Sequence, residues 1–275
     1  MFRLNRINKT LIMIVLIVWA FVNLFPVGIM IFSGFKDTRE IFLSPFSLPA
    51  EWSLDNHIEA WNEANFAQYF INSVLVSVIS IGTILFTSSM AAFVIAKYHF
   101  PGRRLLFLFL ISGLALPVRL AIIPLFLLVR SLGIQDTLIS LILVYTAGGV
   151  SFSMFLLTNF FAGIPNEFHD SAVMDGAGNF RIYAQIYLPL LRPALATVAI
   201  FNFINVWNDF FFPLIFISSE RKMTIPLGIQ SFFGEFSVQW DMLFSALSIA
   251  VVPMIIFFLI LSRQFISGLT EGAIK

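Results

Sequence analysis

The sequence contains no cysteine and few charged residues. Cysteine is absent from all 275 residues, which excludes disulfides, thiol nucleophiles and metal sites built on thiolates. Charged residues make up only 11% of the chain, whereas an average soluble domain carries roughly 25%. The formal net charge of +1 offers no basic surface to a nucleic acid. With 59% hydrophobic residues, the chain is expected to be an integral membrane protein.

Catalytic and phosphate-binding motifs are also missing. The sequence holds no Gly-x-x-x-x-Gly-Lys-Ser/Thr loop, so the chain is not expected to bind or hydrolyse ATP itself. His169, Asp170 and Ser171 are consecutive, and neighbouring helix residues do not face one another as a catalytic triad requires. With only 3 histidines and no cysteine, a metal site is not expected either. We therefore expect no catalytic residue, cofactor or metal in this chain.

Long apolar runs are what the sequence does contain. A helix needs about 20 mostly apolar residues to cross a membrane. Six stretches qualify, at residues 11–32, 70–96, 105–129, 138–161, 194–217 and 243–261. The first is longer than the apolar region of a signal peptide and lacks a small-residue cleavage site, so we expect it to be retained. The sequence thus predicts an all-α polytopic membrane protein with six transmembrane helices, in which residues 1–275 form one transmembrane domain.

The distribution of Lys and Arg predicts the orientation of the helices. With the N-terminus inside, most of the 16 basic residues fall in inner segments. The inner ones are Arg3, Arg6, Lys9, Lys97, Arg103, Arg104, Arg181, Arg192, Arg263 and Lys275. The outer ones are Lys36, Arg39, Arg130, Arg221 and Lys222, and Arg119 lies within a span. Both termini, and the stretch 162–192 between spans four and five, are therefore expected to be cytoplasmic.

That stretch has a mixed composition and includes NEFHDSAVMDGAGNFRIYAQIYLP. Pro165 is suited to a helix start, and Gly176 and Gly178 to the end of that helix or a bend. Asn179 can cap a second helix. The second helix would carry an apolar stripe of Phe180, Tyr183, Ile186, Tyr187 and Leu190. The residues alone leave two interpretations open: a helix lying on the lipid headgroups, or a docking site for another protein.

A spaced motif in the same stretch carries a family resemblance. The run DSAVMDG, followed by nine residues and then IYLP, is similar to the EAA motif of ABC importer permeases. That motif reads Glu-Ala-Ala, three residues, Gly, nine residues, Ile-x-Leu-Pro, and two positions differ here, Asp170 and Ser171. The segments FINVWNDFFFPLIFI and QFISGLTEGAIK, together with YFINSVLVS, resemble the MalG-type permeases of carbohydrate-uptake importers.

The resemblance implies a fold, a function and partners. The fold would be that of the MetI-like permeases, and the chain would be one permease subunit of an ATP-driven sugar or oligosaccharide importer in a bacterial cytoplasmic or inner membrane. Its partners would be a second, MalF-type permease, an ABC ATPase dimer that binds ATP and Mg²⁺, and an extracytoplasmic solute-binding protein. The alternatives are a subunit of an ion-gradient-driven secondary transporter and an ABC permease for a non-sugar solute such as glycerol phosphate.

The resemblance also assigns the ATPase-coupling role to the EAA stretch. The coupling residues would be Glu167, Asp170, Ser171, Ala172, Asp175, Gly176, Gly178, Ile186, Leu188 and Pro189. The shorter side chain of Asp170 leaves open whether it replaces the Glu of the motif, and Glu167 lies one turn earlier on the same predicted helix.

Polar residues inside the predicted spans are candidates for the substrate pathway, because polar groups in a membrane are costly. They are Arg119, Asn202, Asn205, Trp207, Asn208 and Asp209. Residues 202, 205 and 209 step by three and four and so share one helix face. Two alternatives stay open: the Asn side chains could join helices to one another, and Arg119 could extend its charge toward the membrane surface.

Overall fold

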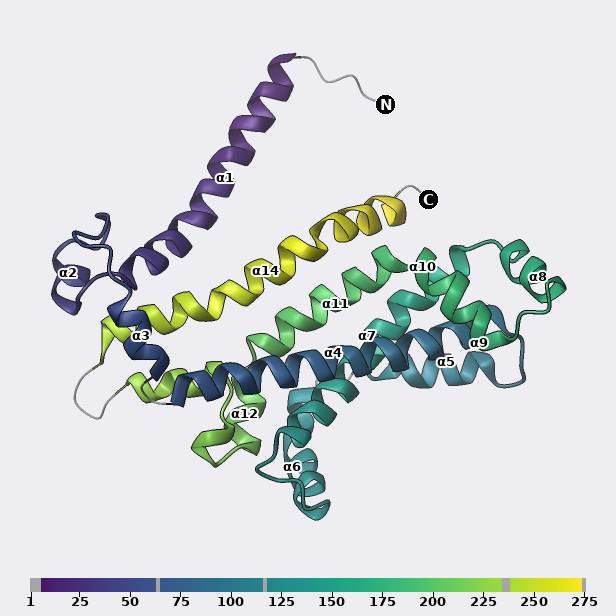
Figure 1. Ribbon diagram of the computed structural model, residues 1–275. Coiled ribbons are helices and arrows are strands. Elements are labelled where there is room, and N and C mark those ends of the chain that lie inside the picture. Colours follow the sequence, from purple (N-terminus) through teal and green to yellow (C-terminus); the bar gives the residue numbers. More distant parts are fainter. Residues whose placement is uncertain (1–5, 63–64, 116–117, 234–237, 274–275) are drawn as a thin grey trace. The chain divides into compact units, whose positions relative to one another are not determined.

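The structure is a computed structural model that describes all residues except 1–5, 63–64, 116–117, 234–237 and 274–275 (Figure 1). Of residues 6–7 and 265–273 it describes the backbone alone. All regular elements in the described ranges are helical, apart from one isolated bridge between Phe233 and Val238. The first half contains α1 (Arg6–Ser33), α2 (Thr38–Leu43), α3 (Asp55–Asn62), α4 (Phe66–Lys97), α5 (Arg103–Ser112), η2 (Val118–Ala121) and α6 (Ile122–Ser131).

The second half begins with a long helix of 26 residues. Its elements are α7 (Leu138–Gly163), α8 (Glu167–Met174), α9 (Asn179–Ile182), η3 (Tyr183–Tyr187), α10 (Leu188–Leu190), α11 (Arg192–Trp207), α12 (Phe211–Phe216), η4 (Glu220–Lys222), α13 (Ile225–Gly228), η5 (Ile229–Phe232) and α14 (Trp240–Ala273). The chain divides into two compact units. The first comprises Met1–Ala67 and Gly228–Val252, and the second Gln68–Leu227 and Pro253–Lys275.

Four helices of the described residues are long and apolar enough to cross a membrane. They are Asn8–Ser33, Phe66–Lys97, Leu138–Gly163 and Trp240–Gln264. A fifth crossing is formed if the pair Asn179–Leu190 and Arg192–Trp207, bent by 77°, counts as one broken span. These helices cover the predicted spans one, two, four, five and six, although α11 ends at Trp207 and leaves the last ten residues of span five to a turn and α12.

The predicted third span, residues 105–129, is divided in the structure. α5 covers its first part and ends at Ser112, where two successive turns follow. A short 3-10 helix then precedes α6, which ends at Ser131. Each α-helix has 10 residues, which is about 15 Å of length and roughly half the thickness of the hydrocarbon core. Gly113, at the end of α5, lies so close to α7 that an added Cβ would be 2.5 Å from the Ser151 Oγ, so this break is tightly packed.

In the first unit, the end of α1 packs against the start of α14. The Ser245 Oγ donates a 2.7 Å hydrogen bond to the Gly34 carbonyl, and a Cβ on Gly34 would lie 3.2 Å from the Ser245 Cα. Lys36 is fully buried, and its ammonium donates to the carbonyls of Ser44 and Ser47 at 2.8 and 2.7 Å. By contrast, the apolar residues of α1 from Leu11 to Leu24 are exposed within the chain, as expected for a helix surrounded by lipid or by another subunit.

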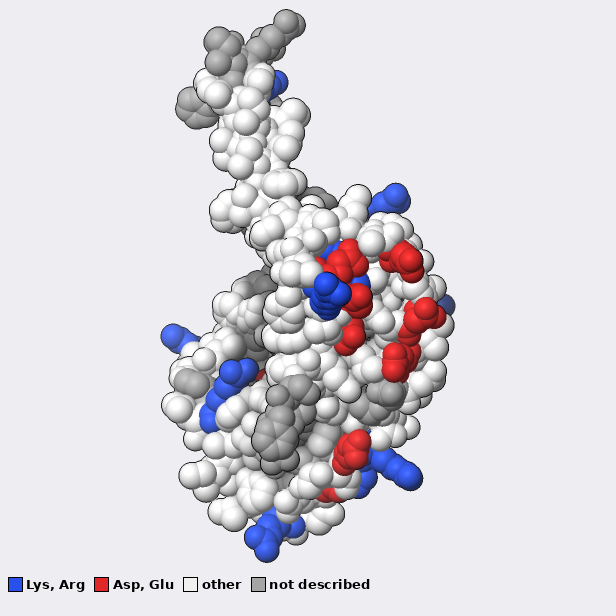
Figure 2. All heavy atoms as spheres, turned by 90° about the vertical axis from the view of Figure 1, so that its left-hand side faces the viewer, with Lys and Arg blue, Asp and Glu red and all other residues white. Residues whose placement is uncertain are grey.

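The second unit is built around α7, which contacts α5, α11 and α12. One cluster of buried residues lies near the end of α4 and the polar stretch 162–192, and a second lies around the start of α7 and α12. Figure 2 views the whole chain from the left-hand side of Figure 1. Most of the surface on this side is uncharged, and the Asp and Glu side chains are gathered in part of it. A surface with so little charge is suited to contact with lipid.

Candidate functional site

The first helix of the polar stretch, α8, begins after Asn166 and ends at a glycine turn. Glu167 and Asp170 lie in its first turn, where negative charge is favoured by the helix dipole. Gly176 has a φ of 77°, a left-handed conformation that glycine adopts at little cost. The Ala177 N–H donates to the Ala172 carbonyl at 2.9 Å and the Gly176 N–H to the Val173 carbonyl at 3.0 Å. These two bonds form a Schellman motif, which fixes the direction of the chain after α8.

The second helix differs in two details from the sequence prediction. Its N-cap is Gly178, with an ordinary φ of −73°, while Asn179 is already the first helical residue. The prediction that Asn179 is the cap is therefore wrong by one position. Gly178 has room for a Cβ, so only Gly176 is required as glycine by its backbone conformation.

The apolar stripe of that second helix is also displaced. A π-helical turn spans Tyr183–Tyr187, in which the Leu188 N–H bonds to the Tyr183 carbonyl five residues back. Because this turn inserts one residue into the helical register, the buried position that follows Tyr187 is Leu191 and not Leu190. Ile182, Tyr183 and Tyr187 are buried, whereas the predicted stripe members Phe180 and Leu190 are 69% and 48% exposed.

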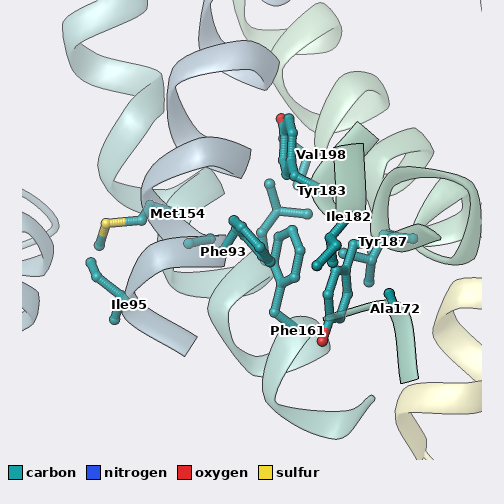
Figure 3. Packing of buried hydrophobic residues seen from close by; sticks show 13 residues of the cluster. Phe93, Ile95, Met154, Phe161, Ala172, Ile182, Tyr183, Tyr187 and Val198 are labelled. Carbon is teal, nitrogen blue, oxygen red and sulfur yellow. The ribbon is translucent and has the colours of Figure 1, made fainter. Parts of the chain in front are cut away.

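Aromatic side chains attach the second helix to the transmembrane helices (Figure 3). The ring of Phe93 on α4 has its centroid 5.7 Å from Phe161 on α7, 5.4 Å from Tyr183 and 5.2 Å from Tyr187. The hydroxyls of Ser89 and Tyr183 are 2.6 Å apart and share a buried hydrogen bond. We call Phe93, Phe161, Tyr183 and Tyr187 the aromatic cluster. Its close packing makes the polar stretch a stiff extension of α4, α7 and α11.

A lysine connects the same elements by polar contacts. The Lys97 ammonium, at the end of α4, donates to the Ile164 carbonyl at 2.6 Å and to the Asn166 Oδ1 at 3.0 Å. It also lies 5.4 Å from the centre of the Tyr187 ring. Lys97 therefore satisfies a carbonyl just past the end of α7 and positions the residue that precedes α8. Figure 1 shows α8 near the end of α4, consistent with these bonds.

The motif residues divide between a buried side and an exposed side. Ala172 is buried, and Ile186 and Leu188 are half-buried. The exposed members are Glu167, Asp170, Ser171, Asp175, Gly176, Gly178 and Pro189. A shallow groove of about 410 Å³ is lined by Glu167, Phe168, Ser171, Ala172, Asp175 and Ile186. The motif therefore presents a carboxylate-rich surface on a firmly packed base.

Three apolar residues of α8 in or beside the motif are exposed: Met174 by 86%, Val173 by 50% and Phe168 by 49%. Phe168 lies four residues before the buried Ala172, a helical spacing that the sequence contains, whereas Val173 and Met174 were not singled out from the sequence. Exposed large apolar side chains rimmed by polar groups are typical of a surface that contacts another protein.

A second candidate site lies in the middle of the second unit. A cavity of about 380 Å³ is bounded by η2, α7, α11 and α12, and four of the predicted pathway residues line it: Arg119, Asn202, Asn205 and Asp209. Trp207 and Asn208 do not. Trp207 is 3% exposed, stacked on Phe203 and edge-on to Phe70, and the Asn208 side chain donates to the Ile204 carbonyl of its own helix.

Asp209 is the centre of a polar network at this cavity. Its side chain accepts bonds from the Tyr145 hydroxyl at 2.9 Å and the Phe212 N–H at 3.0 Å, and it is 3.2 Å from an Arg119 nitrogen. Asp209 is nearly buried, with a side-chain exposure of 6%, whereas that of Arg119 is 68%. The carboxylate therefore fixes one end of the guanidinium and leaves the other donors of Arg119 accessible.

The cavity also has amides and an aromatic wall. Asn202 is buried and donates to the Ser153 Oγ at 3.0 Å, so it joins α11 to α7, while Asn205 is exposed. The rings of Phe152 and Phe201 lie 4.3 Å apart on the same cavity. Gly149 allows α7 to lie close to Asn202 of α11, because a Cβ at Gly149 would lie 2.6 Å from the Asn202 Oδ1. Flat rings beside amide, carboxylate and guanidinium groups can bind a polar, hydroxyl-rich ligand.

A third group of contacts connects two loops of the second unit. The Asp136 carboxylate accepts from the N–H groups of Ser218 and Ser219, each at 2.9 Å, and from the Ser219 hydroxyl. The Lys222 ammonium lies 3.2 Å from the same carboxylate and donates to the Asp136 carbonyl at 2.6 Å. We call Asp136, Ser218, Ser219 and Lys222 the Asp136 clasp. It holds the α6–α7 turn against the segment after α12.

Comparison with known proteins gives consistent matches over nearly the whole chain. Residues 84–271 match the family model described as the binding-protein-dependent transport system inner membrane component. The chain is 36% identical over 262 residues to the diacetylchitobiose uptake system permease protein NgcG of Streptomyces coelicolor, covering 94% of this chain and 87% of that protein. It is 32% identical over 278 residues to the arabinooligosaccharides transport system permease protein AraQ of Bacillus subtilis, covering 100% of this chain and 97% of that protein.

A solved structure has the same arrangement of helices. A chain of a bacterial ABC transporter involved in the import of the acidic polysaccharide alginate superimposes with a TM-score of 0.83. The match covers 96% of this chain and 99% of that chain at 21% sequence identity, a level at which the likeness concerns the fold alone.

Proposed function

We propose a function on one premise: this chain belongs to the family of inner membrane components of binding-protein-dependent transport systems. The predicted all-α, MetI-like permease fold is confirmed by the family match and the structural likeness. A permease is a multi-pass membrane component of a transporter and not an enzyme. The function that the sites support best is that of a permease subunit in an ATP-driven carbohydrate importer, forming half of its translocation pathway.

The single observation that carries this proposal is the construction of the polar stretch. It has an exposed surface of carboxylates and large apolar side chains, fixed by the Gly176 turn and anchored to α4 and α7 by the aromatic cluster. A segment that only lay on lipid headgroups would have no need of such a stiff base. A lever that transmits movement from a separate protein to the transmembrane helices requires one.

The rest of the importer is supplied by partners. An ATPase dimer binds ATP with Mg²⁺ and receives the exposed surface of α8 in a cleft. A second, MalF-type permease completes the pathway, and an extracytoplasmic solute-binding protein delivers the substrate. The excess of Lys and Arg in the inner segments supports cytoplasmic termini and a cytoplasmic position for residues 162–192, in the cytoplasmic membrane of a bacterium.

Carbohydrate is the substrate class that the relatives and the cavity support together. The two relatives named above are called permeases for diacetylchitobiose and for arabinooligosaccharides. In this chain, Phe152 and Phe201 offer flat surfaces to a sugar ring, and Asn205, Asp209 and Arg119 offer hydrogen-bonding groups to its hydroxyls. Of the six predicted pathway residues, we assign the four that line the cavity to the pathway, and we assign Trp207 to helix packing.

A second candidate substrate follows from the exposed part of Arg119. A guanidinium with unused donors also binds carboxylates and phosphates, so an anionic solute such as glycerol phosphate would fit the same cavity. Uptake of radiolabelled oligosaccharide in cells that express the whole importer, with competition by neutral oligosaccharides or by glycerol phosphate, separates the two. Competition by the neutral sugars alone supports the carbohydrate assignment, and competition by glycerol phosphate alone overturns it.

The coupling role is tested with a pair of matched proline substitutions. Gly176→Pro replaces a residue with a φ of 77° and removes its N–H bond to the Val173 carbonyl at 3.0 Å. Gly133→Pro, in the turn after α6, replaces a residue with a φ of 68° and removes its N–H bond to the Arg130 carbonyl at 3.1 Å. Since proline fixes φ near −65°, both variants suffer the same kind of backbone strain.

We expect Gly176→Pro to insert into the membrane but to lose co-purification of the ATPase and sugar uptake, while Gly133→Pro keeps the ATPase. Equal retention of the ATPase by both variants would contradict the coupling role. Sugar uptake that follows an ion gradient in liposomes containing the permeases without the ATPase would instead favour the secondary-transporter alternative.

A further inference from the structure

One large cavity on the described part of the chain is not used by the proposed function. It has a volume of about 920 Å³ and lies between the end of α4, the first half of α5 and the second half of α7. Its lining is Ile95, Phe100, Gly102, Arg103, Arg104, Leu105, Phe107, Leu108, Thr158 and Asn159. The walls are therefore mostly apolar, with two adjacent arginines at one end.

The two arginines have no anionic partner among the described residues. Arg103 is half-buried and Arg104 is exposed, and neither forms an ion pair with a carboxylate in the described part of the chain. The carboxylates of this unit that do pair, Asp136 and Asp209, bind Lys222 and Arg119. Two unpaired guanidinium groups beside one cavity provide charge complementarity for an anionic group.

The apolar part of the cavity is suited to hydrocarbon. Phe107 packs inward against the cluster of buried residues around Phe93, whereas Leu105 and Leu108 are 74% and 49% exposed. α5 begins with the two arginines, so its exposed apolar side chains follow them directly along the helix. A ligand in this cavity would meet two positive charges at one end and leucine and phenylalanine side chains along the rest.

The position of the cavity relative to the membrane follows from Lys97. Lys97 ends α4 directly before the turn that leads to α5, and its ammonium contacts Ile164 and Asn166 at the start of the coupling stretch. The cavity thus lies at the end of the unit that the proposed function places at the cytoplasmic surface, and this inference rests on that placement. The cytoplasmic leaflet is the one in which anionic phospholipids attract basic residues.

We infer that this cavity binds an anionic phospholipid of the cytoplasmic leaflet, with its phosphate between Arg103 and Arg104 and an acyl chain along Leu105 and Leu108. Basic pockets between transmembrane helices bind lipid headgroups in this way. Thr158 and Asn159 line the cavity and directly follow Leu157, which belongs to the buried cluster under the coupling stretch. A lipid in the cavity would therefore contact the part of α7 that supports this stretch.

The test places a fluorescent reporter in the cavity. Leu105→Trp introduces a tryptophan at an exposed lining position of the full importer complex, and the same complex without this substitution gives the background of the native tryptophans. Each complex is reconstituted into phosphatidylcholine vesicles that contain increasing amounts of brominated phosphatidylglycerol or brominated phosphatidylcholine. Bromine quenches tryptophan on contact, so the dependence on lipid fraction gives the relative affinity of the two lipids.

We expect phosphatidylglycerol to be preferred, and we expect the preference to fall about fivefold when Arg103→Gln or Arg104→Gln is added and about 25-fold with both. The matched control is Arg263→Gln, an exposed arginine of α14 on the proposed cytoplasmic side and outside the cavity, which should keep the preference.

Four results would overturn the inference. The first three are equal quenching by the two lipids in the parent, an unchanged preference in the double variant, and loss of quenching with excess inorganic phosphate, which would point to a soluble anion. The fourth is a reporter that no lipid reaches until the permeases are separated, which would show that the second permease covers the cavity. Failure of the coupling proposal would appear as ATPase retention by Gly176→Pro, and it would leave the lipid preference unchanged.

Discussion

Two junctions of the second unit hold distant segments together by different means. The aromatic cluster joins the coupling stretch to α4 and α7 through the packing of three rings around Phe93, with the Ser89–Tyr183 hydrogen bond and the Lys97 contacts in addition. The Asp136 clasp joins two loops through polar bonds, all of which involve one carboxylate or its own carbonyl.

The difference indicates how each junction responds to load. In the aromatic cluster Phe93 contacts the three other rings and Phe161 also contacts Tyr187, so the contacts are spread over many atoms and the packing resists deformation. In the Asp136 clasp, loss of one side chain removes several bonds together. A distributed junction is suited to the part that transmits force from an ATPase, while a junction centred on one residue is suited to holding a loop in a fixed position.

The largest expected effect comes from removing the central ring of the cluster. Phe93→Ala leaves a cavity among Phe161, Tyr183 and Tyr187, and we expect it to lower the free energy of unfolding by about 3–5 kcal/mol. Phe93→Leu should lose less, because it fills part of the space. Thermal unfolding of the detergent-solubilised complex measures both. Equal unfolding temperatures for wild type and Phe93→Ala would show that the rings do not hold the coupling stretch.

A smaller effect is expected at the clasp. Asp136→Asn keeps the shape and the left-handed backbone that Asp136 adopts at a φ of 55°, but it removes the charge that binds Lys222. We expect a loss of about 1–2 kcal/mol in thermal unfolding, with ATPase binding unchanged. A loss of ATPase binding in this variant would mean that the two junctions are not independent.

The clasp also predicts a pH dependence. Burial alone would raise the pKa of Asp136, but the bonds from Ser219, Ser218 and Lys222 outweigh it and hold this pKa well below its ordinary value of 3.8. A lowered pKa stabilises the fold above that ordinary value, and the contribution declines as the pH falls below it. The difference in unfolding temperature between wild type and Asp136→Asn should therefore be constant from pH 7 to about pH 5 and shrink only in more acidic buffer. A difference that disappears near pH 6 would contradict this explanation.

The smallest effect concerns the cavity network. Tyr145→Phe removes the 2.9 Å bond to Asp209, whose carboxylate keeps the Phe212 N–H and Arg119. We expect a loss of about 1 kcal/mol in stability and a raised KM for sugar uptake, because Arg119 is held less firmly. Asp209→Asn, which weakens the hold on Arg119 directly, should raise KM further. An unchanged KM in both variants would remove this network from the pathway.

The sequence predicted local features better than those that depend on distant contacts. The glycine turn after α8 was predictable because Gly176 follows a helical pattern, and the long apolar helices were predictable from their length. The prolines at positions 117 and 124 indicated an irregular third span, but the place where α5 ends was not predictable, because the packing of Gly113 against Ser151 depends on α7. The shift of the apolar stripe depends on the π-turn at Tyr183–Tyr187, which no simple periodicity reveals.

The candidate sites show the same limit. Asn202, Asn205 and Asp209 line one cavity together with Arg119, as predicted from their spacing, although Asp209 lies beyond the end of α11 and does not share its helix face. The sequence could not reveal that Tyr145, 64 residues from Asp209, completes the network, nor that Trp207 turns toward Phe203 and Phe70 instead. Those outcomes depend on which faces of α7 and α11 meet.

The absence of cysteine makes the most direct test of the coupling role simple. Met174→Cys places a single thiol at an 86% exposed position of α8, and Leu132→Cys places one at a 59% exposed position after α6 as a control. A membrane-impermeant maleimide is applied to intact cells and to inside-out vesicles, with and without the ATPase bound. We predict that Cys at position 174 reacts only in inside-out vesicles and is protected by the ATPase, while Cys at position 132 reacts only in intact cells. Labelling of position 174 from outside intact cells, or labelling that the ATPase does not reduce, would contradict the account.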